Sequence, residues 1–146
     1  MPKLVETLCA PEKLKQVVSD CCMLIDQEVG SKSGLSGLAL KGGYKLVKSF
    51  KPGFVPDVVQ TLLPEFCTTL DPIVQDARAQ SRSIRSFFDA DRGRVAESLL
   101  AITDERSKRS KHAAIKGAYD KLRGMAKKHV EEAVPRISAL IEKHAA

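Results

Sequence analysis

The sequence predicts an all-α fold, with six to eight helices in one bundle-like domain covering residues 1–146. Apolar residues recur at spacings of three and four in several long stretches, which is the period of a helix. No stretch of useful length alternates apolar and polar residues as a half-buried strand would. The 146 residues are 43% hydrophobic but only 5% aromatic, without Trp, so Leu, Ile, Val and Ala must build the core. A chain of this size fits a single domain.

The first expected helix begins at Pro11 and ends near Gly30. Proline is favourable in a first turn, and Glu12 interacts well with the helix dipole. Its apolar face consists of Leu14, Val17, Val18, Cys21, Leu24 and Ile25. The next expected helix spans about 33–50, where the Pro-Gly pair at 52–53 ends it.

Three prolines divide the middle of the chain. Pro56, Pro64 and Pro72 each suit the first turn of a short helix, and Asp71 is a good N-cap for the last one. Residues 77–86 have little apolar content and are expected to form a surface connection. Helical periodicity then returns at Phe87, Phe88, Val95, Leu99, Leu100 and Ile102.

The C-terminal segment is expected to be one long helix. Apolar residues form a single stripe from Ile115 to Leu140, and Pro135 should kink the helix because it removes a backbone hydrogen bond. His129 lies on this stripe, where we expect a core histidine with satisfied hydrogen bonds rather than a ligand-binding residue.

A weak internal repeat relates residues 18–71 to residues 95–142. LKGGYKLVKSF at 40–50 aligns with IKGAYDKLRGM at 115–125. The matched identities are Lys41, Gly42 and Tyr44 with Lys116, Gly117 and Tyr119. The repeat predicts two pseudo-symmetric three-helix halves around a shared core, and chance similarity between amphipathic helices is the alternative.

Glycines stand in expected helix interiors, where each costs about 1 kcal/mol relative to alanine. We expect them to allow close helix packing; contact with a ligand and a break in the helix are the alternatives. The residues concerned are Gly34, Gly37, Gly42, Gly43 and Gly117.

Positive charge is concentrated in two stretches of a chain whose net charge is +6. Residues 106–128 contain nine basic residues and one acid, Asp120, and residues 31–56 contain five lysines and no acid. The repeat makes these stretches equivalent, so they could form one basic surface or two ordinary solvated faces. The candidate anion-binding residues are Lys41, Lys45, Lys48, Lys116, Arg123 and Lys127.

The leading hypothesis is therefore a non-enzymatic helical binding module whose basic face meets an acidic or phosphate-bearing partner. Nucleic acid, an acidic protein and an anionic lipid surface all carry the required charge. The second hypothesis is a carrier or sensor of an apolar ligand held between the two halves, where Gly37, Gly42 and Gly43 permit close approach. Homo-oligomer formation is left open.

Enzymatic activity is the third and least favoured hypothesis. GLSG at 34–37 falls short of a nucleophile elbow, and no GxGxxG occurs. His112, His129 and His144 lack the close spacing of a zinc-binding helix, so we assign no catalytic residue, metal or cofactor. The four cysteines lack a CxxC spacing and are expected to be reduced. Without a signal peptide or apolar span, a cytoplasmic location is expected.

Two segments resemble a family of small bacterial proteins of unknown function, with members in actinobacteria and other bacteria. The first is KSGLSGLALKGGYKLVKSFKPGFVPDVVQTLLPEF, and the second is AIKGAYDKLRG followed by EEAVPRISALIEKH. The resemblance spans almost the full length. It implies a cytosolic bacterial protein that forms a complete domain, and it brings no catalytic or binding residue with it.

Overall fold

The computed structural model describes residues 3–145. This part of the chain forms seven helices and no strand, which confirms the all-α class. The helices are α1 (Leu4–Leu8), α2 (Pro11–Ser31), α3 (Gly34–Ser49), α4 (Phe54–Ala79), α5 (Ile84–Asp89), α6 (Arg92–Lys108) and α7 (Ala113–Ala145).

The helix boundaries in the first third of the chain follow local chemistry. Pro11 and Glu12 occupy the first turn of α2, as expected. Gly34 opens α3 with a φ of 72°, and Gly53 precedes α4 with a φ of 74°. These are left-handed conformations that glycine adopts without a steric penalty. The two glycines therefore set the turns on either side of α3.

Helix α4 corrects the expectation of several short helices. Pro64 and Pro72 lie inside one continuous helix of 26 residues. Each proline removes the hydrogen bond to the carbonyl four residues earlier, on Gln60 or Thr68. All four residues are exposed, so water can satisfy those carbonyls. Asp71 caps a different helix: its carboxylate accepts a 2.8 Å hydrogen bond from the backbone amide of Leu4 in α1.

The expected surface connection at 77–86 is shorter than predicted. Helix α4 continues to Ala79 and α5 begins at Ile84, so only residues 80–83 lie between them. Ala77 and Ile84 are buried in the core. The polar residues around them occupy the outer side of these helices, and Ala77 and Ile84 suffice to bury the inner side.

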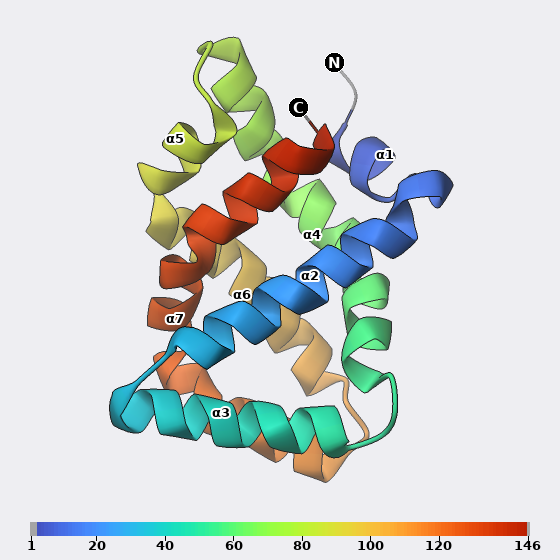
Figure 1. Cartoon of the computed structure of the whole chain (residues 1–146), viewed down its shortest axis with the longest axis vertical. Coiled ribbons are helices and arrows are strands. Elements are labelled where there is room, and N and C mark those ends of the chain that lie inside the picture. The colour runs from blue at the N-terminus through green and yellow to red at the C-terminus, as the bar shows by residue number, and fades with distance from the viewer. Residues whose placement is uncertain (1–2, 146) are drawn as a thin grey trace.

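Figure 1 shows α3 lying across one end of the molecule, with α1, α5 and the end of α7 toward the other. Helix α7 starts behind α3 and changes direction along its length (Figure 1). Pro135 is the helix-interior residue of α7 that cannot donate a backbone hydrogen bond. The second part of α7 is attached to α2, because Asp20 bonds Lys143 at 2.9 Å and His144 at 2.7 Å.

Candidate functional site

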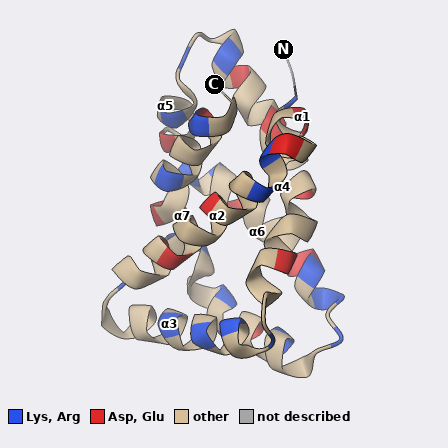
Figure 2. Ribbon diagram, turned by 45° about the vertical axis from the view of Figure 1, so that its right-hand side comes forward, with Lys and Arg blue, Asp and Glu red and all other residues tan. Residues whose placement is uncertain are grey.

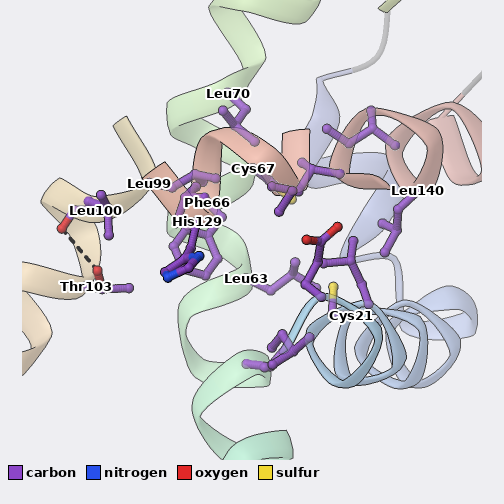
Figure 3. Close-up of a pocket in the computed structure, with 18 of the residues that line it drawn as sticks. Cys21, Leu63, Phe66, Cys67, Leu70, Leu99, Leu100, Thr103, His129 and Leu140 are labelled. Carbon is purple, nitrogen blue, oxygen red and sulfur yellow. Dashed lines mark hydrogen bonds between the residues drawn. The ribbon is translucent and has the colours of Figure 1, made fainter. Parts of the chain in front are cut away.

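A cavity of about 330 Å³, the central cavity, lies between α2, α4, α6 and α7 and is partly open to solvent. Leu4 and Leu8 of α1 and Leu40 of α3 complete its wall. Figure 3 shows the lining side chains, most of which are aliphatic.

The apolar stripes of the surrounding helices produce this lining. On α4, Leu63, Phe66, Cys67 and Leu70 follow the three- and four-residue spacing of one helix face and all line the cavity. The stripe on α7 contributes His129 together with Ala133, Ile137 and Leu140. The sequence predicted the stripe on α7, whereas the stripe on α4 appears only in the structure, which shows space left between the two.

His129 brings an unsatisfied polar group to the cavity wall. Its side chain is only 10% exposed. Among the described residues, neither ring nitrogen has a hydrogen-bond partner. Nδ1 lies 3.4 Å from Oε1 of Glu132, within ion-pair distance but without hydrogen-bond geometry. Nδ1 is thus held near Glu132, whereas Nε2 has no partner among the described residues, so the expectation of a core histidine with satisfied hydrogen bonds is wrong for Nε2. Figure 3 shows His129 among the lining side chains.

Charged side chains join α2 to α7 at one side of the cavity. The ammonium of Lys32, which lines the cavity with Glu28, lies 3.0 Å from the Glu28 carboxylate and 3.2 Å from that of Glu132. Burial opposes the charge on Lys32, but these two hydrogen bonds outweigh it and raise its pKa. Arg136 adds a 3.0 Å contact to Glu28. The opposite charges balance one another, so this group does not by itself demand a charged ligand.

The cysteines near the cavity are poor nucleophiles. Burial raises the pKa of the Cys21 thiol to about 12 and raises that of Cys67 as well. The reactive form of cysteine is the thiolate, which these two residues do not form near neutral pH. All four cysteines are free. In residues 3–145 no three His, Cys, Asp or Glu side chains come together as a metal site would require.

The six candidate basic residues divide between α3 and the first part of α7. Lys41, Lys45 and Lys48 lie on the exposed side of α3 and line a shallow hollow together with Tyr44 and Ser49. Figure 2 shows these basic residues along α3, which contains no acid.

On α7, two of the three candidates are neutralised by carboxylates of α6. Arg123 bonds Asp104 at 2.8 Å, and Lys127 lies 3.1 Å from Glu97. Lys116 is exposed and has no ion pair with a described residue. The six residues therefore do not form one unneutralised surface, and of the six only Lys41, Lys45 and Lys116 have no ion pair with a described residue.

The same three-residue arrangement occurs twice. In the first triad, Asp26 of α2 accepts a 2.6 Å hydrogen bond from Tyr44 and lies 3.5 Å from Lys48. In the second triad, Asp104 of α6 accepts hydrogen bonds from Tyr119 and Arg123. Tyr119 and Arg123 each follow their counterparts by 75 residues, the separation of the sequence repeat.

The five candidate glycines have different roles. A Cβ added to Gly43 would overlap the side chain of Leu122 in α7, and one added to Gly37 would lie 2.8 Å from the carbonyl carbon of Lys32. Gly34 supplies the left-handed turn before α3. At Gly42 and Gly117 an added Cβ would meet no atom within 4 Å. Close helix packing therefore does not explain these last two glycines.

Comparison with known proteins identifies one family. Residues 4–145 match the model of the Family of unknown function (DUF6918). No curated protein and no solved structure matches the chain. Separately, no helix within residues 3–145 is both long enough and apolar enough to cross a membrane.

Proposed function

We propose that this chain, which belongs to the DUF6918 family of unknown function, binds an apolar small molecule in its central cavity. The observation that carries the proposal is an aliphatic cavity lined by a single imidazole whose Nε2 has no partner among the described residues. The ligand class that fits is a straight-chain molecule with one terminal hydroxyl or carboxyl group. The chain would act as a carrier or sensor of this molecule.

The size of the cavity supports occupation. A volume of about 330 Å³ falls at the lower end of the range for small-molecule sites, which is roughly 300–1,000 Å³. An apolar ligand that filled this space would remove the aliphatic lining from contact with water, which is favourable.

His129 supports a ligand with one polar end. A buried polar group without a partner costs about 1–3 kcal/mol, which a ligand hydroxyl or carboxyl would recover by bonding the imidazole. The hydrocarbon part would lie against the leucines of α4 and α6. Binding is favoured over catalysis because the cavity combines this single imidazole with neutral thiols, and a nucleophile with its base is missing from the described lining.

Displacement of anilinonaphthalene sulfonate, a dye that fluoresces in apolar sites, tests the proposal. Decanol and decanoic acid should displace the dye from the wild-type protein in a saturable manner. Ala133→Leu narrows the cavity and should weaken binding by tenfold or more, while Ala101→Leu, on the exposed side of α6, should leave it unchanged. Equal binding by both variants would place the dye outside the cavity and overturn the proposal.

A second variant tests the polar end of the site. His129→Leu should weaken decanol binding about tenfold because the ligand hydroxyl loses its partner. Binding of the dye reports whether this variant still has an accessible cavity. Unchanged decanol affinity would remove the role given to His129 and leave a purely apolar site.

We also propose that the two halves are copies of one unit, with the cavity between them. A second cavity, of about 450 Å³, supports this idea. At its separation of 75 residues, the repeat pairs three of its lining residues with three that line the central cavity. The pairs are Ile115 with Leu40, Phe54 with His129 and Val58 with Ala133. A cytoplasmic location remains part of the proposal, and four free cysteines suit a reducing compartment.

A further inference from the structure

The outer face of α3 exposes large apolar side chains beside lysines. Leu35, Leu38 and Leu46 are 88%, 67% and 45% exposed. Lys41 and Lys45 are also exposed and have no ion pair with a described residue. Because exposed leucines and unpaired lysines lie side by side on it, we infer that the outer face of α3 docks on an anionic lipid surface.

The helical geometry places these residues on one side. The exposed leucines extend over about 17 Å of helix at a rise of 1.5 Å per residue, and Lys41 and Lys45 lie along one edge of their strip. The opposite side of α3 faces the protein, where Gly43 packs against Leu122 and Leu40 lines the central cavity. Helix α3 therefore has a second apolar strip that the rest of the chain leaves uncovered.

The combination of leucine and lysine favours a lipid surface over nucleic acid. A helix lying in a membrane interface buries leucines among the acyl chains while its lysines meet anionic headgroups. Nucleic acid would bind the lysines through its phosphates. Its bases stack on aromatic side chains and would leave the exposed leucines uncovered. Lys41, Lys45 and Lys48 line the hollow with Tyr44 and Ser49, where a lipid phosphate could meet several donors.

One carboxylate reduces the charge of this face. Asp26 lies 3.5 Å from Lys48 and accepts the hydroxyl hydrogen of Tyr44. Lys41 and Lys45 therefore provide most of the charge for docking. The inference rests on the outer face of α3 and not on occupation of the cavity, so either proposal can fail alone. Docking would bring the α3 side of the cavity close to the lipid surface.

Co-sedimentation with vesicles tests the inference on the full chain. The two vesicle types are pure phosphatidylcholine and phosphatidylcholine with about one third phosphatidylglycerol, which supplies the negative surface potential. Three double variants are compared with the wild type: Lys41→Gln with Lys45→Gln, Leu35→Ser with Leu38→Ser, and a control, Lys15→Gln with Arg94→Gln. The control removes the same charge from exposed positions in α2 and α6. Circular dichroism verifies that each variant is folded.

The wild type should bind the anionic vesicles and not the neutral ones. Each lysine removed near the surface should weaken binding about fivefold, so the lysine pair should lose roughly 25-fold. The leucine pair should lose tenfold or more, because leucines enter the acyl region, and the control should change by less than about twofold.

Three results would overturn the inference. The first is a wild type that does not bind anionic vesicles or binds both vesicle types equally. The second is retention of binding by the leucine pair, combined with capture of duplex DNA that depends on the lysines alone, which would assign the face to nucleic acid. The third is concentration-dependent dimerisation that the leucine substitutions abolish, which would assign it to a second copy of the chain.

Discussion

The two triads combine the same kinds of residue, an acid, a tyrosine and a cation, but differ in how firmly the cation is held. Arg123 forms a two-pronged contact with Asp104, with Nε at 2.8 Å from Oδ1 and Nη2 at 3.2 Å from Oδ2. Thr103 extends this network by a 2.7 Å contact to the Tyr119 hydroxyl. In the first triad Lys48 approaches Asp26 only to 3.5 Å, and both side chains are about half exposed.

Arg123 therefore makes a structural contact, whereas the charge of Lys48 is available to another partner. A guanidinium that engages both carboxylate oxygens is held in place and strongly neutralised. An exposed lysine near a carboxylate gains about 0–1 kcal/mol and can turn to another anion. Charge that is locked in the second half is therefore available in the first, on the same helix that exposes its leucines.

The halves also differ at the cavity. The proposed repeat pairs His129 with Phe54, which would place an imidazole in one half where the other has a phenyl ring. Their chain paths differ too, because residues 50–53 separate α3 from α4, whereas α7 covers the corresponding region as one bent helix.

The largest expected effect on stability comes from removing the carboxylate of each triad. Asp104→Ala should lower the free energy of unfolding by about 2 kcal/mol, because partly buried donors on Tyr119 and Arg123 lose a charged partner. Asp26→Ala should cost at most about 1 kcal/mol, since its partners are more exposed. Urea denaturation of both variants measures the difference. Equal losses would contradict the distinction between a structural and an available triad.

The pH dependence of stability should reflect the second triad. Hydrogen bonds from Arg123 and then Tyr119 hold the pKa of Asp104 below its ordinary value of 3.8. A carboxyl whose folded-state pKa is lowered stabilises the protein above its unfolded-state pKa, and this contribution is lost as the pH falls through the folded-state value. The wild type should therefore lose more stability than Asp104→Asn between pH of about 5 and 2, measured by urea denaturation at each pH. Parallel losses in both proteins would exclude Asp104 as a source of acid sensitivity.

The paired glycines offer a smaller test of the repeat. The proposed repeat pairs Gly42 with Gly117, and a Cβ added at either position would meet no neighbouring atom. Gly42→Ala and Gly117→Ala should therefore each raise the free energy of unfolding by up to about 1 kcal/mol. Gly43→Ala should gain less or lose stability, because its Cβ would overlap Leu122. The midpoints of thermal unfolding give the comparison. A gain at Gly43 equal to that at Gly42 would show that α3 and α7 separate easily at this contact.

The smallest effect is expected from exchanging the two cations. Arg123→Lys removes the two-pronged contact and should cost about 1 kcal/mol, while Lys48→Arg should change stability by at most about 0.5 kcal/mol. Chemical denaturation of the two single variants and of the double variant would resolve these values. If Arg123→Lys left the free energy of unfolding unchanged, the two-pronged geometry of the Arg123–Asp104 contact would not contribute to stability.

Local sequence signals predicted some features correctly and misjudged others. The spacing of apolar residues and Pro11 identified α2, and the Pro-Gly pair at 52–53 marked the end of α3. Pro64 and Pro72 do not end α4 because they lie on its exposed face, where water can bond the unpaired carbonyls of Gln60 and Thr68. The connection at 77–86 was overestimated because Ala77 buries a helix side without a large apolar residue.

The candidate sites depended still more on tertiary contacts. The basic stretches were visible in the sequence, but the carboxylates that neutralise Arg123 and Lys127 belong to α6, and only packing brings them together. His129 was recognised as part of an apolar stripe. Its missing hydrogen-bond partners depend on which groups the neighbouring helices place around it.

Spacing and composition along the chain predicted the helical class, the helices α2, α3 and α7 and the concentration of basic residues, but neither α1 nor the continuity of α4. The tertiary structure decided which charges are neutralised, where the leucines of α3 remain uncovered and how much space the core leaves. Each of these properties is set by the distance between side chains on different helices, and no local pattern specifies that distance.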